Sequence, residues 1–155
     1  MIVPVEGLLD EILRVVYPDM WDSNSQAMPL MLKRLKRPLP VWPALYPGID
    51  IIANRVSPPH TDRGGAVGFY DHLVCFGQDH DARLHLSELD GQFAYGPGTS
   101  VLFSGKALTH SVSEWSGVER LVIAHYAKDE MHCMLNVPRP SLPTQFGWWS
   151  KYTHS

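Results

Sequence analysis

The spacing of hydrophobic and polar positions changes near residue 49 and divides the chain into a helical part and a β-rich part. Over residues 5–17 the apolar positions recur every three or four residues, which predicts an amphipathic helix that ends at Pro18. A second helix is predicted through MPLMLKRLKR, before the prolines at 38 and 40, with a cap from Asp22, Ser23 or Ser25. The stretch PLPVWPALYPG then predicts an extended connector that packs Trp42 and Tyr46.

From residue 49 onward, short apolar stretches alternate with glycine, proline and aspartate turns. The predicted strands are IDIIANRV, YDHLVCFG, ARLHLSEL, QFAYG, TSVLFSG, HSVSE and VERLVIAHYA. The letters LDGQF predict a hairpin turn, because Asp-Gly tolerates positive φ. Many short strands with turns between them favour a β-sandwich or a small barrel. A short helix is predicted after Asp129, followed by an irregular tail that packs Trp148, Trp149 and Tyr152 on the core.

Composition suits one folded domain, because 45% of the 155 residues are hydrophobic and 19% are charged. We expect a single domain over 1–155. Its parts are helices and connector over 1–48, a β core over 49–132 and a packed tail over 133–155. The net charge of −3 excludes an overall basic field that would attract nucleic acid.

The apolar runs and the cysteines argue against a membrane protein and against a secreted one. No apolar run is long enough for a membrane helix, and the start MIVPVEGLLDEIL carries acids, unlike a signal peptide. Cys75 and Cys133 are too few for a disulfide scaffold or a thiolate zinc site. We therefore expect an intracellular protein, nuclear or cytoplasmic, that is a monomer and does not bind a membrane.

The stretch PPHTDRGG is a candidate metal site, because His60 and Asp62 are two residues apart. In an extended chain their side chains point the same way, so that an imidazole and a carboxylate can reach one cation. His110 opens a later predicted strand and is a candidate third ligand. Two histidines and one carboxylate form the facial triad of non-haem iron(II) oxygenases. The alternative is a turn in which Asp62 caps backbone amides and the histidines are structural.

Arg120 lies ten residues after His110, on a predicted strand that is otherwise apolar. A buried arginine must be paired, and the carboxylate of a small-molecule ligand would pair with it through two hydrogen bonds. The alternative is a salt bridge to Glu119, Glu114 or Asp62.

The alternation of side chains along strands sorts the remaining histidines. On the strand of Arg120 it directs Val122, Ala124 and Tyr126 to the same side as Arg120, and His125 to the outside. His72 is interpreted as a satisfied core histidine, and His132 as a residue near the mouth of the site.

The spacing of His60, Asp62, His110 and Arg120 resembles that of the 2-oxoglutarate- and iron(II)-dependent dioxygenases. Within that superfamily, NRVSPPHTDRGGAVGFYDHLVCFG and the strands that follow are similar to the TET/JBP family, most of all to its compact fungal-type members. The resemblance covers about residues 49–132. It implies a mostly β chain with N-terminal helices and a double-stranded β-helix core, also called a jelly-roll or cupin-like core.

The resemblance also implies roles for individual residues. His60, Asp62 and His110 would ligate iron(II), Arg120 would bind the far carboxylate of 2-oxoglutarate, and Arg55 would lie near its other end. The implied co-substrate is O2, with ascorbate as reductant. In this family the substrate is the methyl group of 5-methylcytosine or thymine in a flipped-out base, a reaction that leads to DNA demethylation. The candidates for substrate contact are Tyr70, Asp71, Tyr126 and Lys128.

Two other functions stay open at this point. The chain could be a 2-oxoglutarate oxygenase that hydroxylates a protein side chain or a small molecule, or a jelly-roll binding module without turnover. For a nucleic-acid partner, DNA is expected rather than RNA. The basic residues are either a contact surface for it or a solvated helix face, and they are Lys33, Arg34, Lys36 and Arg37, with Arg63 beside the metal site.

Overall fold

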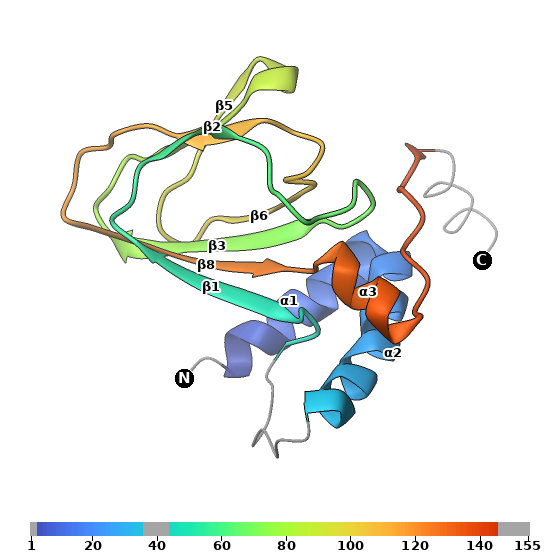
Figure 1. Cartoon of the computed structure of the whole chain (residues 1–155). Helices are drawn as coiled ribbons and strands as arrows, with labels where there is room; N and C mark the ends of the chain where they lie inside the picture. Colours follow the sequence, from blue (N-terminus) through green and yellow to red (C-terminus); the bar gives the residue numbers. More distant parts are fainter. Residues whose placement is uncertain (1–2, 36–43, 146–155) are drawn as a thin grey trace.

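Three helices and two four-stranded antiparallel sheets make up the part of the chain that the structure, a computed structural model, describes: residues 3–35 and 44–145 (Figure 1). The helices are α1 (Val3–Val16), α2 (Pro18–Leu35) and α3 (Asp129–Leu135). Figure 1 shows them together on one side of the first sheet, with the second sheet on the other side. Helices and strands hold similar numbers of residues, so the expectation of a mostly β chain was too strong.

The first sheet has the strand order β1-β8-β3-β6 and the second has the order β2-β7-β4-β5. Every pairing in the two sheets is antiparallel. The first sheet consists of β1 (Gly48–Ala53), β8 (Glu119–Tyr126), β3 (Asp71–Gln78) and β6 (Ser100–Phe103). The second consists of β2 (Ser57–His60), β7 (His110–Val112), β4 (Arg83–Leu86) and β5 (Gly91–Ala94).

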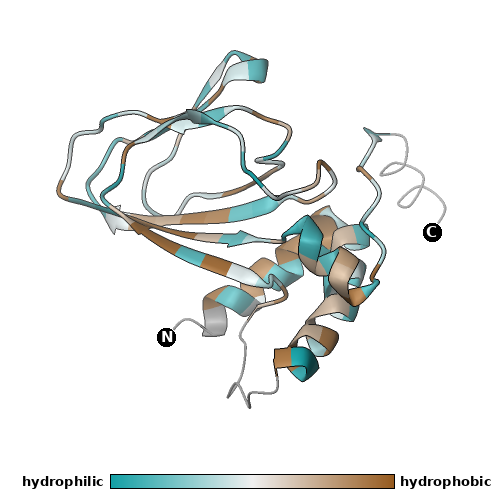
Figure 2. Cartoon of the chain, viewed as in Figure 1, coloured by the Kyte–Doolittle hydropathy of each residue, from teal (hydrophilic) through white to brown (hydrophobic). Residues whose placement is uncertain are grey.

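Two clusters of buried side chains lie on the two faces of the first sheet. One lies between the sheets and contains Cys75, Ala82, Leu84, Leu86, Tyr95, Phe103, Val112 and Val122. The other packs the helices against the sheet and contains Leu13, Tyr17, Met20, Tyr46, Phe69 and Ala127. Figure 2 shows the matching pattern, with hydrophobic and hydrophilic positions alternating along the strands of the first sheet. No helix among the described residues is long and apolar enough to cross a membrane.

The predicted helices are present, but α2 begins earlier than its predicted caps. Proline at the first position of a helix is favourable because the N–H that it lacks would have no partner there, and Pro18 therefore opens α2. Pro29 lies inside the same helix. The predicted end of this helix at Pro38 and most of the connector, with Trp42, lie outside the described residues, as do Trp148, Trp149 and Tyr152.

Each of the predicted strands contains an observed strand, whereas β2 was missed. Two prolines, Pro58 and Pro59, hid it, because proline cannot donate to a ladder and reads as a turn. The structure tolerates them because β2 is an edge strand, paired only with β7 and with an irregular register. The predicted hairpin is confirmed: β4 and β5 pair, and Asp90 in the connection has a φ of +46°. The helix predicted after Asp129 is α3.

Two expectations about histidines were wrong. His125 is on the face of β8 opposite Arg120, but it is fully buried, because α1 covers that face and brings Glu6 to it. His132 is also fully buried and contacts Ser23 of α2 and the ring of Phe69, so it does not lie at the mouth of a site. His72 is buried and its Nε2 lies 2.7 Å from the Ser100 hydroxyl, as expected for a core histidine.

Candidate metal centre

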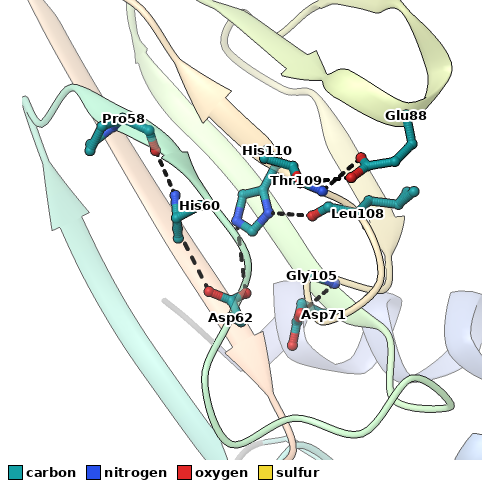
Figure 3. Close-up of polar contacts among 9 residues, drawn as sticks. All are labelled: Pro58, His60, Asp62, Asp71, Glu88, Gly105, Leu108, Thr109 and His110. Atoms are coloured by element: carbon teal, nitrogen blue, oxygen red, sulfur yellow. Dashed lines mark hydrogen bonds and ion pairs between the residues drawn. The ribbon is translucent and has the colours of Figure 1, made fainter.

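His60, Asp62 and His110 converge on one point between the sheets (Figure 3). His60 ends β2, His110 begins β7, and the two residues are directly paired across the strands. Asp62 follows in the loop after β2. Its Oδ1 lies 3.7 Å from Nε2 of His60, and its Oδ2 lies 3.8 Å from Nε2 of His110. One ligand atom from each of the three residues lies within 4.8 Å of the others, a spacing at which they could hold a metal ion.

Backbone carbonyls fix the orientation of both imidazole rings. Nδ1 of His60 lies 2.7 Å from the carbonyl oxygen of Pro58, and Nδ1 of His110 lies 3.0 Å from that of Leu108. Because a carbonyl oxygen only accepts, each Nδ1 carries the proton and donates it. The lone pair of each Nε2 therefore points toward Asp62 and is available to a metal.

The turn that leads into His110 is held in place by Glu88. The Glu88 carboxylate accepts two hydrogen bonds from Thr109, one from its amide at 2.7 Å and one from its hydroxyl at 2.6 Å (Figure 3). Glu88 belongs to the short 3-10 helix between β4 and β5, Ser87–Leu89. The adjacent hairpin thus fixes the backbone immediately before the second histidine.

Asp62 lies beside a second carboxyl group, that of Asp71 at the start of β3. The Gly105 amide donates to Oδ2 of Asp71 at 3.0 Å, and the Gly105 carbonyl accepts from the Asp62 amide at 2.8 Å. Burial, followed by the charge of Asp62, raises the pKa of Asp71 to about 7, and the Gly105 amide opposes the rise. A hydrogen bond between the two carboxyl groups also raises this pKa.

A cavity of about 340 Å³ lies between the two sheets and contains the three converging residues. Its volume is within the range of small-molecule sites. Apolar walls come from both sheets and include Leu73, Leu84, Val112 and Val122. Arg120, Val122, Ala124 and Tyr126 all line the cavity, as the predicted alternation along β8 requires, but His125 also lines it although its ring pairs with Glu6 on the helix side.

Arg120 is a buried cation in this cavity, with 3% of its surface exposed. Its guanidinium lies over the rings of Tyr95, at 5.0 Å, and Trp115, at 5.2 Å. It donates to the Arg55 carbonyl at 3.3 Å, and its Nε has no hydrogen-bond partner. No carboxylate among the described residues pairs with it, so the alternative of a salt bridge to Glu119, Glu114 or Asp62 is not what the structure has.

The residues present fit an iron(II) and 2-oxoglutarate site. Two imidazoles and one carboxylate with open positions are the ligand set of non-haem iron(II) oxygenases. A buried arginine without a carboxylate partner is costly, and a ligand carboxylate would remove that cost. Burial raises the pKa of the Tyr95 hydroxyl beside it, although the Arg120 charge partly opposes this rise.

The other predicted site residues divide between the cavity and the helix side of the sheet. Arg55, Asp71, Tyr126 and Lys128 line the cavity. Tyr70 does not: its ring packs against Tyr17 at 5.0 Å, and its amide contacts the sulfur of Met20.

Sequence reasoning missed the aromatic pair that holds Arg120, which comes from Tyr95 and Trp115. Tyr95 lies on another segment of the chain, and Trp115 lies between His110 and Arg120 in the sequence. No spacing signals such contacts before the strands are paired.

Comparisons with known proteins give a structural similarity only. No family model matches the chain, and no curated protein matches it. A solved structure described as "NgTET1 in complex with 5mC DNA" is similar, with a TM-score of 0.49 and 18% sequence identity. The alignment covers 72% of this chain and 44% of that chain, so this chain spans less than half the length of that protein. The function proposed below therefore rests on the residues of the cavity.

Proposed function

We propose that this chain is an iron(II)- and 2-oxoglutarate-dependent oxygenase that oxidises the methyl group of a modified base, 5-methylcytosine or thymine, in DNA. One observation carries the proposal: the His60, Asp62 and His110 group and the unpaired cation of Arg120 line the same cavity. The order β1-β8-β3-β6 facing β2-β7-β4-β5 supports a jelly-roll core. The antiparallel pairing of His60 with His110 would then join two strands of its smaller sheet.

The chain itself would hold and orient the reactants. His60, Asp62 and His110 would bind the metal, which together with 2-oxoglutarate and O2 supplies the oxidising chemistry for an unactivated C–H bond. Arg120 would fix the far carboxylate of 2-oxoglutarate through two hydrogen bonds, because its planar group suits that geometry. Arg55 would lie near the other end of the co-substrate. The apolar walls of the cavity would exclude water from the reacting atoms.

The charge at the rim of the cavity supports an anionic substrate. Arg55, Arg63 and Lys128 are exposed and line the cavity. Apart from Asp62 of the candidate metal site, Asp50 is the one exposed acid among the described residues that line it. The rim is therefore positive on a chain whose net charge is −3. Cations around a cavity that takes a single base would contact the phosphates on either side of the flipped nucleotide.

Nucleoside mass spectrometry tests the reaction. The purified protein is incubated in air with iron(II), 2-oxoglutarate and ascorbate, and with DNA or RNA that contains 5-methylcytosine, thymine or N6-methyladenine. We expect an oxidised nucleoside from the wild type and none from the His60→Ala/Asp62→Ala variant. Succinate that depends on the metal residues, without an oxidised base, would indicate an oxygenase with another substrate. Neither product, in protein shown to bind iron, would indicate a binding module.

Fluorescence anisotropy with a short labelled oligonucleotide tests the rim. Because phosphate contacts release counterions, Arg63→Glu combined with Lys128→Glu is expected to weaken binding and to reduce its salt dependence. The matched control reverses the same number of charges on α2, with Lys33→Glu and Arg34→Glu. If only the control weakened binding, the contact surface would be the helix and not the rim.

A further inference from the structure

Asp71 lies next to the metal triad without being part of it. It comes from the first sheet, at the start of β3, whereas His60 and His110 come from the second sheet. It was expected to contact substrate. Figure 3 shows Asp71 beside Gly105, with Asp62 nearby.

Gly105, in the turn after β6, brings the two carboxyl groups together. Its carbonyl accepts from the Asp62 amide at 2.8 Å, while its own amide donates to Oδ2 of Asp71 at 3.0 Å. A Cβ at this position would lie against Oδ2 of Asp62 and 2.5 Å from Oδ2 of Asp71. Both carboxyl groups can therefore lie next to residue 105 only because this residue has no side chain.

The orientation of the Asp62 carboxylate is a demanding requirement of the site. Asp62 is in a loop and its side chain is 44% exposed, yet its two oxygens face different histidines, Oδ1 toward His60 and Oδ2 toward His110. An unsupported loop carboxylate would rotate, and ordering it would weaken metal binding. The two imidazoles have backbone carbonyls that hold them, and Asp71 stands in the equivalent place for the carboxylate.

We propose that Asp71 is a positioning residue, which holds the Asp62 carboxylate in the orientation that metal ligation requires. The inference rests on the proposed function only in that the triad binds a metal. An asparagine at position 71 offers the Asp62 carboxylate an N–H donor in the place of the Asp71 carboxyl group, whereas an alanine offers nothing.

Titration with Co(II), followed by its visible absorption, measures the effect on the metal site alone. Loss of an outer partner of a ligand typically weakens metal affinity about 10- to 100-fold, and we expect a loss of this size for Asp71→Ala. Asp71→Asn is expected to restore most of the affinity and the wild-type Co(II) spectrum. The matched control is Asp50→Ala, which removes another carboxylate that lines the cavity and is expected to leave the affinity unchanged.

Wild-type affinity in Asp71→Ala would overturn the proposal, and so would an Asn variant as weak as the Ala variant. Unchanged affinity with a raised KM for the oligonucleotide would instead make Asp71 a substrate contact, which also overturns it. If Asp71→Ala does not fold, Asp71→Ser replaces it, because serine is too short to reach Asp62. Succinate formation by the wild type reports on the proposed function separately, so that either idea can fail alone.

Discussion

Two acids on α1, Glu6 and Glu11, are expected to differ widely in how much they stabilise the fold, because Glu6 forms a buried pair with His125. Glu6 and His125 are both 0% exposed, and Nε2 of His125 lies 3.0 Å from the Glu6 carboxylate. Nδ1 of His125 donates to the His72 carbonyl at 3.0 Å, so both ring nitrogens are engaged. On the exposed side of α1, Glu11 pairs with Arg14 at 2.6 Å, but these side chains are 61% and 54% exposed.

Burial sets the expected magnitudes. Removing one partner of a buried pair leaves the other without compensation and costs about 3–5 kcal/mol. At about 2–4 °C per kcal/mol for a domain of this size, Glu6→Ala is expected to lower Tm by roughly 6–20 °C. An exposed pair contributes about 0–1 kcal/mol, so Glu11→Ala is expected to change Tm by at most a few degrees.

Urea unfolding of the two variants, and of each combined with an alanine at its partner, gives two double-mutant cycles. The Glu6–His125 coupling is expected to exceed the Glu11–Arg14 coupling clearly. Glu6→Gln separates loss of charge from loss of volume, since it fills the same space. Equal losses of stability in Glu6→Ala and Glu11→Ala would refute the reasoning, because distance and not burial would then set the cost.

Three further predictions concern other parts of the chain. Burial lowers the pKa of His72 from 6.5 to about 3 in the folded protein. As the pH falls below 6.5, the unfolded chain therefore binds a proton at His72 that the folded chain does not bind, and the free energy of unfolding decreases. In urea unfolding between pH 6.5 and 4, the free energy of unfolding of His72→Gln should rise relative to that of the wild type by about 1.4 kcal/mol for each pH unit that the pH is lowered. A difference that stays constant over this range would contradict the prediction. Gly7→Ala, in open space on α1, should raise the free energy of unfolding by about 0.5–1 kcal/mol. Arg120→Lys should raise the KM for 2-oxoglutarate about 10- to 100-fold, because it loses one charge-assisted hydrogen bond to the carboxylate. An assay of succinate formation measures this KM, and Arg83→Lys is the control that should leave it unchanged.

Local patterns predicted the parts of the site that depend on neighbouring residues. The two-residue spacing of His60 and Asp62 and the alternation along β8 are properties of an extended chain, and they needed no knowledge of pairing. The direct pairing of His60 with His110 depends on β2, which its two prolines concealed.

The parts that sequence did not give depend on contacts between distant segments. Glu6 looks like a surface acid of an amphipathic helix, and only the packing of α1 on the first sheet makes it the partner of His125. The meeting of Asp62 and Asp71 at Gly105 depends on how two loops and a strand end come together. Neither contact has a spacing that a single sequence displays.

The pairing of His60 with His110 has a consequence for how the chain resists unfolding. β2 lies at the edge of its sheet and is joined to it only through β7, with two prolines and an irregular register. A metal shared by the two histidines would cross-link these strands much as a disulfide does. At a hundredfold excess of free metal over Kd the folded state would gain about 2.7 kcal/mol. Resistance to proteolysis near β2 would then serve as a gauge of metal supply, with the unloaded chain cut first.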